Sequence, residues 1–379
     1  MTAETASSPI PSRPGPAAND QTREKAGGGA CRPDSGGQAG LISLGIDIGG
    51  TKIEGVALDR DRRVLATCRL PSRQGSQAVH DDTVTVARRL MSLAEVGDRR
   101  DGITLGLGIP GRIDSLRGTV DDAVNLGIGH MDLGPSVSRT LGIPVQVEND
   151  VNIAALGAAC QSHSSLVGSG ERGRGGDDAT LPQDMGEMPQ TRSLPPEKER
   201  VVVFINLGTG LAAGIIRNGS IEHGASGAVG EIGHIPADFH DFPCKCGQTG
   251  CLETVASGSA VEAMWPGVPH PLPDMIDKAR QGDAHAKESL AVIGHGIAMA
   301  VQIVALTVDP SLIILGGGMT KTGQPLLDLV DAELDKSARA SHFIASLDLP
   351  ARIRLAPPDL PIGAIGAALA GRKAGRLQV

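Results

Sequence analysis

The sequence is poor in aromatic side chains. Its 379 residues include no tyrosine, one tryptophan and four phenylalanines. A hydrophobic core must therefore be built mainly from alanine, valine, isoleucine and leucine, which suits buried strands and helices that pack closely through small residues. A chain of this length can form two domains. Its 52 glycines predict many tight turns.

Basic runs and long apolar runs are also missing. The formal net charge is −8, and no run of lysine and arginine is interleaved with aromatics, which argues against nucleic-acid binding. The first residues, MTAETASSPIPSRP, lack the apolar stretch of a signal peptide. The longest apolar run, GIAMAVQIVALTV at 296–308, is shorter than the ~20 residues of a membrane span and predicts a buried helix. We therefore expect a cytoplasmic protein without a membrane partner.

Two segments have no hydrophobic periodicity. Residues 1–40 and 161–200 are rich in proline, glycine and serine, so we predict a disordered tail and a disordered insert. The insert divides an N-terminal α/β domain, 41–160, from a C-terminal domain, 201–362. The alanine- and glycine-rich end, 363–379, predicts a helix that joins the N-terminal domain.

The two halves begin with the same pattern. Residues 41–70 predict three strands with intervening turns, and residues 201–224 repeat this plan at an offset of 159. The duplicated β-β-β opening, followed by helices, predicts an α/β protein with two similar β-β-β-α-β-α units around a cleft. The matched positions are Ile46 with Ile205, Asp47 with Asn206, Gly49 with Gly208, Gly55 with Gly214 and Asp59 with Asn218.

Glycine turns follow the first strand of each half. In DIGGTK, 47–52, backbone N–H groups can approach a phosphate closely, while Thr51 and Lys52 add a hydroxyl and a positive charge. The Walker spacing is absent, so this is not a P-loop. The matching turn NLGTG predicts a second grip on a polyphosphate, and LGGGM allows close approach of a nucleotide; ordinary turns are the alternative. The residues expected to bind phosphates or nucleotide are Gly49, Gly50, Thr51, Lys52, Gly208, Thr209, Gly210, Gly316 and Gly317.

The motif VEND, 147–150, places polar side chains at the end of a predicted strand. Proteins of the α/β class bind ligands at the carboxyl ends of their strands, so the carboxylate of Asp150 is a candidate for chemistry. Capping of the following helix is the alternative for Asp150. Asn149 offers both a donor and an acceptor, which suits a sugar hydroxyl.

Half of the six cysteines lie in HDFPCKCGQTGCLE, 240–253. Together with His234, the thiols Cys244, Cys246 and Cys251 can close a tetrahedral site, and four protein ligands predict a structural zinc. The Cys-x-Cys spacing differs from the Cys-x-x-Cys of redox pairs. Spacing alone leaves His240 as an alternative to His234.

The same metal would bring two carboxylates together. Glu231 precedes His234 by three residues, and Glu253 follows Cys251 by two. Bidentate acceptors held in this way suit adjacent sugar hydroxyls. The alternative for each is a solvated surface charge, which is less favoured for Glu231 because it lies in the weakly polar run GAVGEIGHIP.

Taken together, these motifs resemble the ROK family (repressors, open reading frames and kinases). The segments LGIDIGGTKIEGVALD, GLGIPGRID, VENDVNIAALG, NLGTGLAAGI, GEIGH and CKCGQTGCLETVASG occur in its order. The resemblance covers roughly 42–372 without the insert. It implies an actin-like, ribonuclease-H-like fold and ATP-dependent phosphorylation of a hexose at its 6-hydroxyl, with glucose as first choice and N-acetylglucosamine or N-acetylmannosamine as alternatives.

The resemblance also implies roles for single residues. Asp150 matches the catalytic base, and Asp47 matches a residue near the magnesium and the phosphates. Asn125, in 121–134, is our candidate contact beside the sugar's 2-position. Ala212 and Ala213 stand where many relatives have glycines, which puts nucleotide affinity in doubt. The expected sugar contacts are Asn125, Asn149, Asp150, Glu231, His234 and Glu253, and the expected zinc ligands are His234, Cys244, Cys246 and Cys251.

Other members of the family are sugar-responsive repressors. A repressor needs a helix-turn-helix module ahead of the kinase-like part, and we do not expect the 40 proline- and glycine-rich residues that precede it here to form one. A catalytically silent sugar sensor is a further alternative, which Asp150 and the intact first glycine turn disfavour. We expect ATP, Mg²⁺ and structural Zn²⁺ as cofactors, and a homodimer or homotetramer.

Overall fold

The computed structural model describes residues 41–97, 100–167, 200–237 and 240–374. The predicted disordered tail, 1–40, and most of the predicted insert, 168–199, lie outside the described residues.

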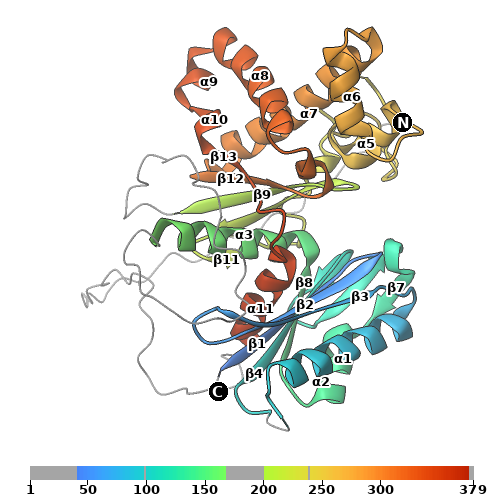
Figure 1. Cartoon of the computed structure of the whole chain (residues 1–379), viewed down its shortest axis with the longest axis vertical. Helices are drawn as coiled ribbons and strands as arrows, with labels where there is room; N and C mark the ends of the chain where they lie inside the picture. The colour runs from blue at the N-terminus through green and yellow to red at the C-terminus, as the bar shows by residue number, and fades with distance from the viewer. Residues whose placement is uncertain (1–40, 98–99, 168–199, 238–239, 375–379) are drawn as a thin grey trace, which may run out of the picture. The chain divides into compact units, whose positions relative to one another are not determined.

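The first half forms a sheet of five strands in the order β3-β2-β1-β4-β8 (Figure 1). Strand β2 pairs antiparallel with β1 on one side and with β3 on the other, whereas β4 runs parallel to both β1 and β8. The parallel strand β4 is buried along its whole length, as expected for a strand covered on both faces. The strands are β1 (Ile42–Ile48), β2 (Lys52–Leu58), β3 (Val64–Pro71), β4 (Ile103–Ile109) and β8 (Val145–Asn149).

The second half repeats this sheet in the order β11-β10-β9-β12-β13, with the same strand directions. The internal repeat and the actin-like α/β topology predicted from the sequence are therefore confirmed. One detail differs, because Ile46 pairs with Gly55 while Ile205 pairs with Ala213, so the second hairpin is one residue tighter. The strands are β9 (Val201–Leu207), β10 (Leu211–Arg217), β11 (Ser220–Ile221), β12 (Leu312–Gly316) and β13 (Ile353–Leu355).

Helices cover the sheets and close two aliphatic cores. Residues of α1 (Ser76–Leu93) and α2 (Leu133–Leu141) share a core with the first sheet, as the lower part of Figure 1 shows. Residues of α7 (Ala284–Val308) and α8 (Gln324–Ala340) share another with the second. The remaining helices of this half are α4 (Glu253–Ala256), α5 (Gly258–Met264), α6 (Pro271–Arg280), α9 (His342–Ser346) and α10 (Leu349–Arg352).

Two helices each pack against the sheet of the other half of the chain. The helix α3 (Asp150–Val167) follows the first sheet but packs against Phe204 of the second, while α11 (Ile362–Ala374) packs on β1 and β4. The two helices cross where Gly157 and Gly366 face each other's backbone, and a Cβ at either position would collide with it. Helix α3 runs seven residues, 161–167, into the segment predicted to be disordered, so that prediction was wrong for this stretch.

A small antiparallel sheet interrupts the first half, and the sequence patterns did not predict it. Its strands are β5 (Arg112–Asp114), β6 (Thr119–Ala123) and β7 (Ile128–Met131), in the order β5-β6-β7. The short 3₁₀ turn η1 (Val124–Leu126) joins the last two strands and carries Asn125.

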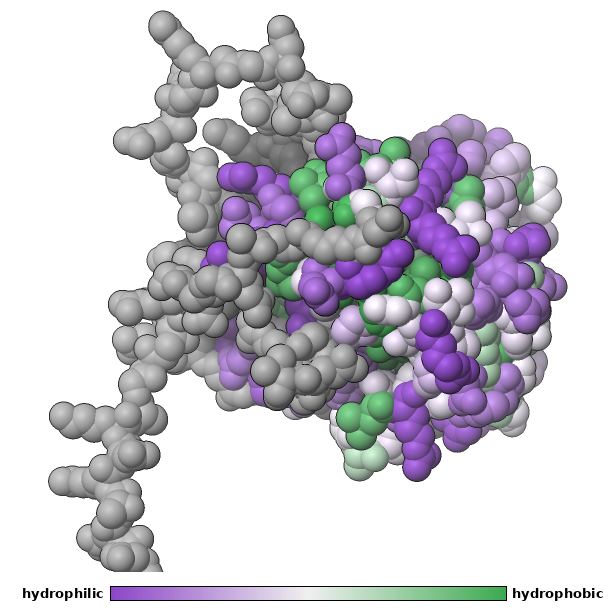
Figure 2. All heavy atoms as spheres, turned by 90° about the horizontal axis from the view of Figure 1, so that it is seen from below, coloured by the Kyte–Doolittle hydropathy of each residue, from purple (hydrophilic) through white to green (hydrophobic). Residues whose placement is uncertain are grey.

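The long apolar helix α7 is a core element. By length and composition it could cross a membrane, but half of its most apolar window is buried. Ile293, Ile297 and Val301 are completely buried in the core of the second half. The buried helix predicted at 296–308 is thus confirmed within a longer one. On the face shown in Figure 2, apolar side chains are scattered among hydrophilic ones, which is ordinary for a protein surface.

Candidate active site

Asp47 lies in the middle of a group of charges at the end of β1. The pKa of its carboxyl is raised to about 7, mainly by burial and then by the negative charges of Asp150 and Glu54, while the positive charge of Lys52 acts in the opposite direction. A Cβ on Gly363 would collide with the Asp47 carboxylate, so this side chain lies against the first turn of α11. A helix N-terminus favours negative charge. The position suits a carboxylate that faces a cation.

The first glycine turn is a tight hairpin. The N–H of Gly49 donates to the carbonyl of Lys52 over 2.9 Å. Lys52 points its Nζ at Glu54 Oε2, 2.7 Å away, rather than into open space. Its predicted role at a phosphate therefore requires it to leave or share Glu54, a residue that the sequence patterns did not single out.

Asn125 lies beside this turn. A Cβ placed on Gly50 would be 3.5 Å from the Cβ of Asn125, so the first glycine turn and the predicted sugar contact are neighbours. Both residues are exposed. The structure thus places Asn125 next to the predicted phosphate turn.

At the end of β8, the cap and the candidate base are separate residues. Asn149 Oδ1 accepts hydrogen bonds from the N–H groups of Val151 (2.9 Å) and Asn152 (3.4 Å), which is the role of an N-cap. Its Nδ2 donates to the carbonyl of Gly111 over 3.4 Å. The predicted sugar contact Asn149 is therefore engaged with the backbone.

Asp150 begins α3 with a partly buried carboxylate. Burial raises its pKa, two backbone amides lower it, and the charge of Glu231 raises it again. Asp47 and Glu231 therefore both lie within electrostatic reach of Asp150. Asp47 lies on β1 and Asp150 begins α3, both in the first half, whereas Glu231 comes from the second half. Three of the predicted residues thus form one acidic group.

The second glycine turn is braced by Glu253. One carboxylate oxygen of Glu253 accepts the N–H of Leu211 over 3.4 Å, and a Cβ on Gly210 would lie 2.9 Å from it. The carbonyl of Gly208 accepts the N–H of Gly258 over 2.7 Å, which ties the turn to α5. The turn is therefore held between β10, α4 and α5.

Asn206 joins the second turn to the third. A Cβ on Gly208 would lie 3.1 Å from its amide nitrogen, and one on Gly317 would lie 2.6 Å from its amide oxygen. Gly317 also has a positive φ of 89°, which favours glycine. By contrast, a side chain at position 316 would collide with the ring of Phe204, so packing requires glycine there. Packing accounts for Gly316 without a nucleotide.

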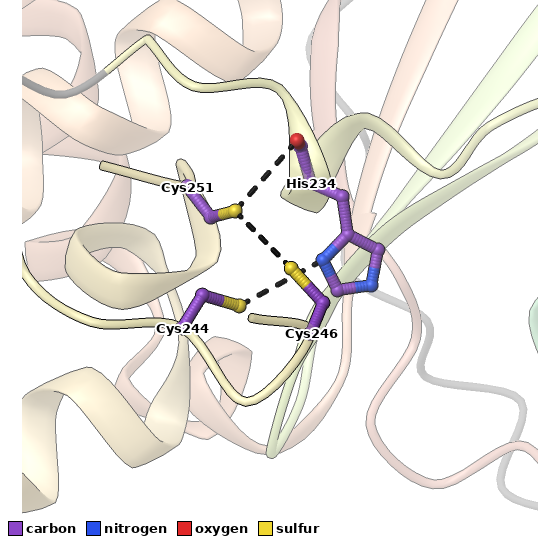
Figure 3. A group of neighbouring side chains, drawn as sticks. All are labelled: His234, Cys244, Cys246 and Cys251. Carbon is purple, nitrogen blue, oxygen red and sulfur yellow. Dashed lines mark hydrogen bonds between the residues drawn. The ribbon is translucent and has the colours of Figure 1, made fainter. Parts of the chain in front are cut away.

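The predicted zinc ligands converge on one point. The ligand atoms of His234, Cys244, Cys246 and Cys251 all lie within 4.8 Å of one another (Figure 3). The Sγ atoms of Cys246 and Cys251 are 3.6 Å apart, and Cys244 Sγ is 3.9 Å from His234 Nδ1. Ligand atoms bonded at about 2.3 Å in a tetrahedron are separated by about 3.8 Å. The residues therefore fit a four-coordinate metal.

The spacing left His240 as a competing ligand, and the geometry favours His234. The ring of His240 stacks on Phe242, with centroids 5.6 Å apart. Figure 3 shows that His234 turns Nδ1 toward the thiols and Nε2 away from them. Cys244 is also 3.4 Å from the carboxylate of Glu253, so the cysteine cluster touches the residue that braces the second glycine turn.

Three residues at the site were not proposed from the sequence. Asn206 could have been found, because the repeat matches it with Asp47. Glu54 follows Lys52 by two positions in a predicted strand, which places both on one face. Glu148 stands inside the VEND motif, but its buried bonds to distant residues leave no local signal.

Comparison with known proteins agrees with this geometry. The ROK family model matches residues 43–169 and 196–370. A glucokinase of Halalkalibacterium halodurans is 30% identical over 303 residues, which are 75% of this chain and 82% of the relative. An N-acetylmannosamine kinase of Shigella boydii is 28% identical over 316 residues, or 80% and 91% of the two chains.

A solved structure supports the same assignment. The ROK family glucokinase from Streptomyces griseus in complex with glucose and AMPPNP superposes with a TM-score of 0.60 and 26% identity, covering 88% of this chain and 99% of that one. The residues that the family model matches include the glycine turns, the VEND motif and the cysteine cluster described above. The chain belongs to the ROK family.

Proposed function

We propose that the protein is an ATP-dependent hexose kinase and that glucose is its substrate. The observation that carries this proposal is the carboxylate of Asp150, which starts α3 beside Glu231 and Asp47 while Asn149 caps the helix. The names of the relatives, glucokinases among them, point to the same reaction class.

In the proposed reaction, Asp150 accepts the proton of the sugar 6-hydroxyl while that oxygen forms a bond to the γ-phosphorus of ATP, and ADP leaves. Glu231, Glu253, His234 and Asn125 orient the sugar through its other hydroxyls. The turns at Gly49–Gly50 and Gly208–Gly210 hold the phosphates by their backbone N–H groups. Magnesium bound with the nucleotide would neutralise phosphate charge near Asp47.

We further propose that the cysteine cluster holds zinc. His234, Cys244, Cys246 and Cys251 would bind it, and the metal would cross-link the segments that carry Glu231 and Glu253. Four protein ligands give the metal a structural role.

The two-domain division predicted from the sequence remains our proposal, with boundaries at 41–160 and 201–362 and with α11 assigned to the first domain. Its support is the matching sheet in each half and the packing of α11 on β1 and β4. We also propose a cytoplasmic homodimer or homotetramer, and no role in binding nucleic acid.

A coupled ATP-turnover assay with a panel of hexoses tests the proposal. Phosphorylation of glucose at the 6-position is the expected result. Absence of turnover with every hexose, together with a sugar-dependent gel shift on DNA, would replace the kinase by a regulator. An acetamido sugar kinase is the second candidate, because a relative with that name covers 80% of this chain.

A further inference from the structure

Glu148 is a buried carboxylate with partners on two distant parts of the chain. It directly precedes Asn149 in β8, and its side chain is 7% exposed. Ser115 Oγ and His223 Nε2 each donate a hydrogen bond of 2.9 Å to the same oxygen, Oε2. The imidazole nitrogen must be the donor here, because a carboxylate oxygen accepts.

The two partners come from the small sheet and from the second half. Ser115 follows β5, and Gln146 of β8 also donates to its carbonyl over 2.8 Å. His223 follows β11 and is 75 positions from Glu148 in sequence. One carboxylate therefore joins the strand that leads to Asp150, the small sheet whose connecting turn carries Asn125, and the segment that leads to Glu231.

The segment between His223 and Glu231 is mostly exposed. It is anchored before its start, where Glu222 N–H donates to Ile215 over 2.9 Å, and near its end, where the carbonyl of Gly230 accepts from Ala213 over 2.7 Å. Within this stretch, the bond from His223 to Glu148 ties it to β8. Val229 packs against the core of the second half, whereas residues 223–228 are exposed and are easily displaced unless such bonds hold them.

We propose that Glu148 and His223 are positioning residues, which hold the 223–231 segment against β8 so that Glu231 and Asp150 keep the spacing that hexose binding requires. This inference rests on the proposed function, since it concerns the placement of the proposed sugar contacts. Neither residue touches the reacting atoms in this account. Their effect reaches the sugar through Glu231.

The first test compares His223→Ala with His223→Gln in steady-state kinetics. Loss of one hydrogen bond to a charged group should raise the KM for glucose about tenfold, with little change in kcat or in the KM for ATP. The Gln side chain retains an N–H donor and should recover part of the loss. His80→Ala is the matched control, because His80 bonds a carboxylate, that of Asp81, over 3.0 Å on α1.

A double variant and hydrogen exchange complete the test. If His223 acts through Glu148, adding His223→Ala to Glu148→Gln should cost much less than the two single losses combined. Amide exchange in 222–231 should be faster in His223→Ala and unchanged in His80→Ala. Unchanged exchange and an unchanged glucose KM in a folded His223→Ala protein would overturn the inference. A wild-type protein that phosphorylates no hexose would instead overturn the proposed function, while the exchange result would still report on the bridge.

Discussion

Asn149 caps the helix that Asp150 begins. The Oδ1 atom of Asn149 accepts hydrogen bonds from the N–H groups of Val151 and Asn152. These first-turn donors have no acceptor within the helix, so a capping aspartate would have to accept them instead. Asp150 still accepts from Val151 over 3.0 Å, but the helix end does not depend on it. The capping role, which sequence alone leaves open for Asp150, is therefore assigned to its neighbour, and this supports our proposal that the Asp150 carboxylate accepts the substrate proton.

Asp150→Asn should abolish turnover while preserving sugar binding. The change keeps the size of the side chain but removes the proton acceptor, and loss of a general base typically costs ~10²–10⁴-fold in rate. Turnover and glucose binding, the latter by calorimetry, are the measurements. Asp81→Asn, on the exposed face of α1, is the control. Near-normal turnover of Asp150→Asn would move the base elsewhere, with Glu231 examined first.

Much of the fold could be predicted because its signals are local. The repeat at an offset of 159 gave both hairpins, and the cysteine spacing brought His234 and the thiols together. What could not be predicted depends on long-range packing. The packing of α3 on the second sheet was not predicted; it involves close glycine contacts such as that of Gly157 with α11, and the one-residue change in the second hairpin follows from strand register.

At the site, the limits of prediction have similar causes. Lys52 and Gly316 read as phosphate-binding residues in the sequence, yet Lys52 pairs with Glu54 and Gly316 makes room for Phe204. A pattern of residue types states which chemistry is available, whereas pairing across strands decides which side chain is already occupied. Glu148 is the clearest case, since both partners lie more than thirty positions away.

Zinc should be present at about one ion per chain, and Cys246→Ser should weaken glucose binding. Opening the cluster would free Glu253, which lies 3.4 Å from Cys244, and the segment that carries Glu231. Elemental analysis and glucose titration are the measurements. Cys160→Ser is the control, because Cys160 lies on α3 outside the cluster. Protein purified without chelators that contains no zinc would refute the site, and full activity after complete chelation would refute its link to the sugar.

Asp47→Asn should stabilise the protein, and more so at pH 8 than at pH 5. The carboxyl has a pKa of about 7 when folded, against about 3.9 when unfolded, so the folded state binds the extra proton between these values. Stability therefore falls as pH rises through this window and is constant above it. An asparagine carries no charge, so the variant removes the free energy that the ionised Asp47 carboxylate costs the folded state. Melting curves at both pH values test this, with Asp81→Asn as control. An equal shift at both pH values would show that the folded pKa is not raised.

Glucose should be preferred over the acetamido sugars by about tenfold or more in kcat/KM, because a site built to bind a hydroxyl discriminates strongly when that group is replaced. Asn125 is exposed beside Gly50, and we propose that it contacts the sugar's 2-position. Asn125→Ala should therefore narrow the ratio between glucose and N-acetylglucosamine while leaving the KM for ATP near its original value. The measurement is kcat/KM for glucose, mannose, fructose, N-acetylglucosamine and N-acetylmannosamine in both proteins.

A tenfold preference of the wild type for an acetamido sugar would reject the glucokinase assignment and keep the kinase assignment. An unchanged ratio in Asn125→Ala would remove Asn125 from the proposed sugar contacts, and Glu231 and His234, the candidates on the second half, would be substituted next.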